Sequence, residues 1–137
     1  SHKPINMVIL ALGCNDCKDY LNLSAEQIAD GARILMHDIR SALNCGPRER
    51  PDQPPNIVLM TPPLVKITAQ SLAWGFEGAD TKSQALASCY LQLADELEVL
   101  AFDVQTVASP SPLDGIHFDS QAQSAIASGL ADLIAPT

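Results

Sequence analysis

The stretch Asn6-Met7-Val8-Ile9-Leu10-Ala11-Leu12-Gly13-Cys14-Asn15-Asp16 decides the fold that the sequence predicts. It begins with a short continuous apolar run and then breaks into a glycine and polar residues. Continuous rather than alternating apolarity is typical of a central parallel strand that is covered on both faces. We therefore expect a buried strand over residues 6–12 and a shaped turn directly after it.

Two further runs have the same buried-strand character. Residues 56–60 read Asn-Ile-Val-Leu-Met and are stopped by Pro62-Pro63, and residues 98–102 read Glu-Val-Leu-Ala-Phe and end at Asp103. Proline ends a strand because it cannot donate to the ladder. The segment 64–78, after the second strand, is expected to be irregular.

Three segments carry helical patterns. The first is predicted over residues 25–43, because Ser24-Ala25-Glu26-Gln27 fits a capping box and four apolar residues follow at helical spacing. These four are Ile28, Leu35, Ile39 and Leu43. Asp80 is expected to cap a second helix over 81–97, and Asp119 a third over 120–133.

The alternation of strand and helix predicts a three-layer α/β sandwich of the flavodoxin type, with a parallel sheet and right-handed crossovers. Functional groups in such folds collect beyond the carboxyl ends of the strands. Here those positions are Gly13–Asp16, Pro62–Gly78 and Asp103–His117. We expect all three polar segments at one rim of a single domain.

Composition narrows the function further. The 137 residues are 47% hydrophobic and carry a formal net charge of -8, which argues against nucleic acid and anionic membranes as partners. No apolar run approaches the ~20 residues that span a bilayer. The four cysteines, Cys14, Cys17, Cys45 and Cys89, are expected to be reduced thiols. A redox or zinc role for Cys14-x-x-Cys17 is disfavoured, since two thiols are too few ligands for a closed zinc site. No metal or organic cofactor is expected.

The pair Asp114 and His117 is the strongest catalytic candidate. Ser109-Pro110-Ser111-Pro112 precedes it as turn-forming sequence, and Gly115 lets the chain turn tightly between the two residues. On such a loop the carboxylate of Asp114 can bind one imidazole nitrogen of His117. The other nitrogen then stays free as a general base. A plain surface pair is the alternative, because Asp-x-x-His alone is a weak motif.

Asn15 is the second candidate. Its amide NH2, placed just past a strand end, could donate to a developing oxyanion, and Gly13 would allow close backbone approach. The alternative is an Asx turn that caps the strand. Trp74, Phe76 and Ile116 are candidates for a substrate pocket, although aromatic residues such as Trp74 and Phe76 occur more often in cores or oligomer contacts.

Two blocks of the sequence resemble those of the SGNH (GDSL-type) esterases. Gly13-Cys14-Asn15-Asp16 is similar to the family's Gly-x-Asn-Asp block, and Asp114-Gly115-Ile116-His117 to its Asp-x-x-His block. Residues 76–83 resemble the small bacterial arylesterase and acyltransferase branch. The resemblance implies that Asp114 orients His117, that His117 is the general base, and that Asn15 is a side-chain oxyanion donor.

The sequence departs from the family at the nucleophile. It contains no Gly-Asp-Ser block, and its serines lie at expected helix caps or surface positions such as Ser24, Ser83 and Ser120. We therefore expect residues 1–137 to be the C-terminal portion of one SGNH domain. The expected partners are a small-molecule ester, an upstream or companion segment with the serine, and further copies of the chain. The alternative is an inactive relative that acts as a binding module.

Overall fold

The computed structural model describes residues 3–136 and contains a parallel sheet of three strands in the order β1-β2-β3. The strands span Met7–Leu10 (β1), Asn56–Met60 (β2) and Leu100–Phe102 (β3). Val8 pairs with Ile57, and Leu59 pairs with Ala101. The predicted parallel α/β fold is confirmed, but β1 and β3 are shorter than expected. For β3 the reason is Glu98, whose φ of 52° places it in a turn rather than in an extended strand.

Over residues 3–136, four α-helices connect and cover the strands. They span Ala25–Ser41 (α1), Ala69–Ala73 (α2), Ala79–Glu96 (α3) and Ser120–Ile134 (α4). The capping box of Ser24 and the cap by Asp119 are both confirmed. The cap by Asp80 is wrong, because α3 already begins after Gly78, whose φ of 70° suits glycine.

The segment 64–78 is not wholly irregular, because it contains the short helix α2. Thr68 accepts a hydrogen bond from the backbone of Ser71, and Ser71 accepts one from the backbone of Thr68, which forms a capping box. Ser83 was expected at a helix cap or on the surface, but it is fully buried in α3. Its hydroxyl accepts from the N–H of Val65 at 3.0 Å and so ties this segment to α3.

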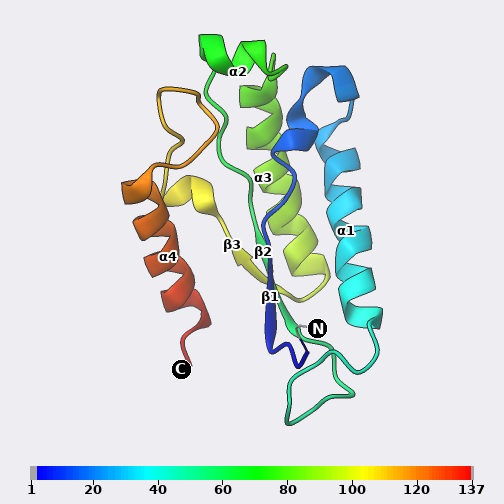
Figure 1. Ribbon diagram of the computed structural model, residues 1–137. Coiled ribbons are helices and arrows are strands. Elements are labelled where there is room, and N and C mark those ends of the chain that lie inside the picture. The colour runs from blue at the N-terminus through cyan, green and yellow to red at the C-terminus, as the bar shows by residue number, and fades with distance from the viewer. Residues whose placement is uncertain (1–2, 137) are drawn as a thin grey trace.

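Helices cover the two faces of the sheet, as Figure 1 shows: α1 and α3 lie on one side, and α4 lies on the other. Ile57 and Leu59 point into the core with α1 and α3, whereas Val58 packs with Phe102 and the α4 residue Ile126. Alternate β2 residues thus pack on opposite faces of the sheet, which explains why the strand is apolar from Ile57 to Met60. Within residues 3–136, no helix is both long and apolar enough to cross a bilayer.

The buried stripe of α1 differs from the predicted one. Ile28 is buried as expected, but Leu35 is 40% exposed, and Leu43 lies beyond the helix and is 83% exposed. The buried face consists instead mainly of small residues together with Met36: Ala25, Ile28, Ala29, Ala32 and Met36. Alanines let α1 approach α3 closely, so the larger leucines lie outside the contact.

β1 forms an edge of the described sheet. It pairs with β2, and the described residues 3–136 supply no strand on its other side. Leu10 is buried toward α1 and α3, whereas Ile9 is 42% exposed and Leu12, just after the strand, is 56% exposed. The prediction that this strand is covered on both faces is therefore wrong for the residues described here.

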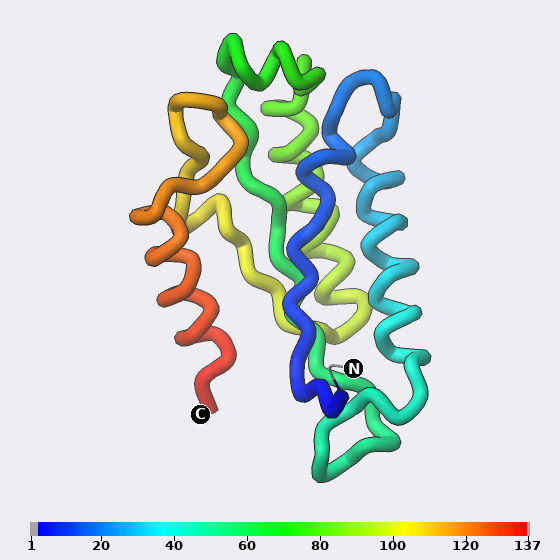
Figure 2. The backbone as a smooth tube through the Cα atoms, in the orientation of Figure 1, coloured from blue at the N-terminus to red at the C-terminus, as the bar shows by residue number. Residues whose placement is uncertain are grey.

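The three segments that follow the strands meet at one end of the molecule. Figure 2 shows the turn after β1, the segment around α2 and the loop after β3 gathered at the same end. This is the arrangement expected from a parallel sheet, in which all carboxyl ends share an edge. The fold thus brings together the candidate residues of the three segments.

Candidate active site

The loop after β3 holds Asp114 and His117 in direct contact. Asp114 Oδ2 lies 2.8 Å from His117 Nδ1. The other carboxylate oxygen, Oδ1, accepts hydrogen bonds from the backbone N–H groups of Ile116 at 2.8 Å and His117 at 3.0 Å. Asp114 thus fixes the loop backbone and the imidazole together. Within residues 3–136 no hydrogen bond occupies His117 Nε2, and this nitrogen is free to exchange a proton.

Hydrogen bonding also sets the charge of Asp114. Its pKa is lowered from an ordinary value of 3.8 to about 2, chiefly by the backbone N–H groups of Ile116 and His117 and then by the His117 side chain. The carboxylate is therefore ionised at neutral pH and can only accept hydrogen bonds. It follows that the proton on a neutral His117 resides on Nδ1 and that Nε2 carries the lone pair.

Gly115 fastens this loop to the segment after β2. Its φ is 76°, and a Cβ on it would lie only 2.0 Å from the carbonyl oxygen of Lys66. The Lys66 N–H donates to the Gly115 carbonyl at 2.9 Å, and the Thr68 hydroxyl donates to the Asp114 carbonyl at 3.0 Å. Both the left-handed conformation and the close approach require glycine here.

The turn after β1 presents Asn15 to the same rim. Asn15 is exposed and begins a short 3-10 helix, Asn15–Cys17. No hydrogen bond of its side chain is present among residues 3–136, so the described structure does not use Asn15 as an Asx cap. Gly13 before it has a φ of 110°, and a Cβ there would lie 2.4 Å from the hydroxyl oxygen of Tyr90. The close packing that Gly13 permits is therefore against α3.

Tyr90 anchors this turn from inside α3. Its hydroxyl donates to the carbonyl of Leu12 at 3.0 Å, directly before Gly13. Burial raises the pKa of Tyr90, so the phenol stays protonated and keeps donating. The sequence alone does not distinguish Tyr90, because one aromatic residue within a helical pattern looks like an ordinary core residue.

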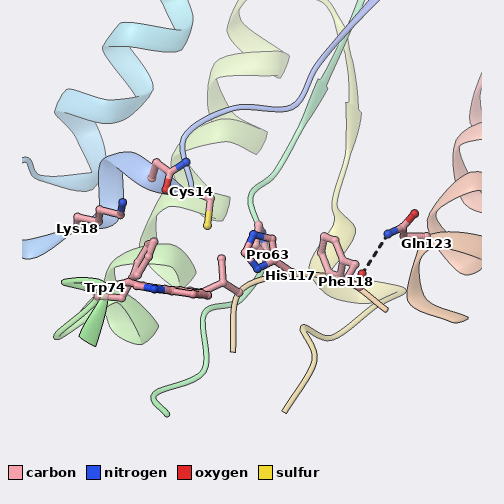
Figure 3. Close-up of a pocket in the computed structure, with 10 residues that line it drawn as sticks. Cys14, Lys18, Pro63, Trp74, His117, Phe118 and Gln123 are labelled. Atoms are coloured by element: carbon pink, nitrogen blue, oxygen red, sulfur yellow. Dashed lines mark hydrogen bonds between the residues drawn. The ribbon is translucent and has the colours of Figure 1, made fainter. Parts of the chain in front are cut away.

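A pocket of about 620 Å³ joins the two loops, and Figure 3 shows it with its lining side chains. Asn15, Trp74, Phe76, Ile116 and His117 were predicted site residues and all line it. Gly13 and Asp114 do not line the pocket, but Gly13 precedes the lining residue Cys14 and Asp114 binds the lining residue His117. The lining also includes five residues that were not predicted to line a pocket: Cys14, Lys18, Pro63, Phe118 and Gln123. No serine lies among these described lining residues.

The wall of the pocket is mostly aromatic and aliphatic. Phe76 is 2% exposed and Trp74 is 40% exposed, so Phe76 belongs to the core while Trp74 faces the opening. The indole of Trp74 meets the imidazole of His117 edge-on, with ring centroids 5.8 Å apart and planes at 81°. This contact restrains the imidazole in addition to its hydrogen bond with Asp114.

The two thiols of Cys14-x-x-Cys17 are weak candidates for chemistry. Burial raises the pKa of Cys14 to about 11 and that of Cys17 to about 12, so both remain thiols at neutral pH. All four cysteines are free in the structure. Within residues 3–136 there is no group of three or more His, Cys, Asp or Glu side chains that could hold a metal ion.

Solved structures similar to this chain include three bacterial esterases. The first is the aryl esterase of M. smegmatis, with 30% sequence identity and a TM-score of 0.84 over 96% of this chain and 60% of that one. A carbohydrate acetylesterase family member from Sinorhizobium meliloti has 33% identity and a TM-score of 0.86, covering 97% and 62%. A second carbohydrate acetylesterase from Sinorhizobium meliloti has 28% identity and a TM-score of 0.84, covering 96% and 60%. No protein-family model matches the chain, and no curated protein matches it.

These comparisons define the class. The chain has the SGNH hydrolase fold, and its structural neighbours are aryl esterases and carbohydrate acetylesterases of the SGNH (GDSL-type) family. The resemblance seen in the sequence is thereby confirmed. The chain spans about three fifths of the length of these solved structures, so their complete activities do not transfer to it directly.

Proposed function

We propose that this chain supplies the acid, the base and one oxyanion donor of a serine carboxylic ester hydrolase. The observation that carries the proposal is the contact between Asp114 and His117. An ionised carboxylate lies 2.8 Å from Nδ1, and Nε2 is left free in a pocket that also contains Asn15. The similarity to aryl and acetyl esterases, at up to 33% identity, supports the same reaction class.

The reaction would proceed through an acyl-serine intermediate. His117 Nε2 takes the proton of a serine hydroxyl while the serine oxygen attacks the ester carbonyl, and Asp114 stabilises the imidazolium that forms. The amide NH2 of Asn15 donates to the negative charge that develops on the carbonyl oxygen. His117 then protonates the departing alcohol. Water, or a second alcohol in acyl transfer, releases the acyl group by the reverse sequence.

The nucleophilic serine would come from a segment outside the described residues, and we place that segment along β1. Among the described residues β1 is paired on one edge only, and Ile9 within it and Leu12 just after it are exposed. Asn15 follows β1 directly, so a strand added there would end next to the oxyanion donor. The length of the solved structures that this chain does not cover is consistent with such a segment.

The alternative function is binding without turnover. The observation that favours it is the lining of the pocket, which contains no serine among the described residues. In that case the Asp114–His117 pair would act only as a hydrogen-bonding group for a ligand. The two functions differ in whether a nucleophile reaches Nε2.

Complementation tests the proposal. The chain is co-expressed with the part of the Sinorhizobium meliloti acetylesterase family member that the match leaves uncovered, and hydrolysis of p-nitrophenyl acetate is measured. Hydrolysis that is lost in His117→Ala supports the proposal. A complex that forms but hydrolyses the ester equally well with His117→Ala contradicts it. A complex that forms and shows no hydrolysis favours the binding module.

A further inference from the structure

Among the described residues, the pocket lining contains one lysine, Lys18, and no arginine, aspartate or glutamate. The other lining residues of the described chain are apolar or uncharged, apart from the titratable His117 and Cys14. Figure 3 shows Lys18 and Gln123 at opposite sides of the labelled residues, with His117 between them. The cation therefore lies to one side of the reacting imidazole.

Two aromatic rings hold the ammonium of Lys18 in place. Its Nζ lies 5.4 Å from the ring centroid of Phe76 and 6.0 Å from that of Tyr20. Cation–π contacts of this kind favour an ammonium at that position without neutralising its charge. The backbone N–H of Lys18 also donates to the carbonyl of Asn15 at 3.3 Å, which links the cation to the oxyanion side of the pocket.

No carboxylate forms an ion pair with Lys18 among residues 3–136. Asp16 and Asp19 are close in sequence, yet the lysine and arginine ion pairs of the described chain join only Arg33 to Asp30 and Glu96. The chain has 16 acidic residues against 8 lysines and arginines, so acidic partners are abundant. A half-buried cation without one is therefore available to a ligand.

We propose that Lys18 is a specificity residue that binds a carboxylate on the ligand of this pocket. The aromatic wall of Trp74 and Phe76 would pack against an apolar portion, and the ammonium would form a charge-assisted hydrogen bond with the anionic end. This inference rests on the proposed function. The preferred substrate is then an ester with an apolar acyl or alcohol portion, and that portion bears a carboxylate several bonds from the ester carbonyl.

Binding of non-reactive probes tests this without any nucleophile. The probes are 4-phenylbutyrate and its neutral counterpart 4-phenylbutanamide, titrated against the 137-residue chain at low salt. Trp74 is the single tryptophan of the sequence and lines the pocket, so its fluorescence reports occupancy directly. Calorimetry gives a second measure of the dissociation constant that does not depend on the reporter.

The expected result is about fivefold tighter binding of the carboxylate than of the amide, as for a partly exposed ion pair. Lys18→Met should abolish the preference, and Lys18→Arg should keep it. Lys3→Met is the matched control, because it removes the same charge from an exposed residue that does not line the pocket. It should bind both probes as the wild type does.

Equal affinity for the two probes in the wild type would overturn the proposal, as would a preference that persists in Lys18→Met. Failure of both probes to bind would overturn it as well. None of these results depends on ester hydrolysis, since neither probe contains an ester. The proposed function fails separately, if the complemented enzyme hydrolyses p-nitrophenyl acetate without His117.

Discussion

The two loops that meet in the pocket differ in how completely this chain fixes them. The loop after β3 is held by hydrogen bonds within the loop, since Asp114 binds two backbone N–H groups and the imidazole of His117. The turn after β1 is fixed in its backbone by Tyr90, but the described structure gives the side chain of Asn15 no hydrogen bond. The chain thus preorganises the proposed base, whereas the proposed oxyanion donor remains available for a substrate.

The largest expected effect is the loss of kcat when the proposed general base, His117, is removed. In the complemented enzyme, His117→Ala should lower kcat by about 10⁴ or more, because removal of a triad base has costs of this order. Asp114→Asn should also cost heavily, since an amide no longer selects the Nδ1–H tautomer. Steady-state kinetics with p-nitrophenyl acetate measures both effects. A His117→Ala enzyme with most of its turnover intact would reject the assignment.

The second prediction concerns the oxyanion side. Asn15→Ala should lower kcat by roughly 10²–10³ and change KM little, because the hydrogen bond strengthens only as charge develops on the carbonyl oxygen. Its free energy of unfolding should change by less than about 0.5 kcal/mol, since no described hydrogen bond of the side chain is lost. Normal turnover with a lower unfolding midpoint would instead make Asn15 a structural residue.

The third prediction tests how the loop after β3 is fastened. Gly115→Ala should destabilise the chain by more than about 2 kcal/mol, because φ is positive and the new Cβ would meet the carbonyl oxygen of Lys66. Gly31→Ala is the control, since it lies within α1 with nothing within 4 Å of the new Cβ. That variant should be more stable by about 0.5–1 kcal/mol. Denaturant unfolding of both variants measures the contrast, and equal effects would contradict it.

The smallest expected effect is a pH dependence. The pKa of Asp114 is depressed in the folded chain, so its stabilising contribution is fully present above the ordinary value of 3.8 and is lost as the pH falls toward about 2. The stability gap between wild type and Asp114→Ala should therefore be constant above about pH 5 and shrink below it. Urea unfolding at several pH values measures this gap.

A control separates this linkage from general acid unfolding. Asp132→Ala changes an exposed carboxylate on α4 that forms no ion pair within residues 3–136. Its stability relative to wild type should follow no such trend between pH 5 and pH 2. A gap for Asp114→Ala that stays constant down to pH 2 would show that the loop does not depend on the ionised carboxylate.

The parts that the sequence predicted well were those set by local chemistry. The capping box at Ser24 and the cap at Asp119 depend on neighbouring residues alone, and both are confirmed. The contact between Asp114 and His117 is likewise formed within one short loop, and the structure contains it. The catalytic roles of these residues, the added serine segment and association into oligomers stay predictions.

The features of the fold and the site that could not be predicted from the sequence depend on contacts between residues far apart in the chain. The exposure of Leu35 follows from how closely alanines let α1 pack on α3, which periodicity alone does not reveal. Lys18 enters the pocket because Phe76, 58 positions further along the chain, lies under its ammonium. The capping box of Thr68 and Ser71 was a readable signal for α2, but prolines and polar residues around it favoured an irregular segment.

The most direct test of the central claim is labelling with a fluorophosphonate, which reacts covalently with an activated serine. Our account predicts no labelling of the 137-residue chain alone. It predicts stoichiometric labelling of the added segment's serine in the complemented enzyme, and loss of that labelling in His117→Ala. Stoichiometric labelling of a serine within the 137 residues, or labelling that does not change in His117→Ala, would contradict the account.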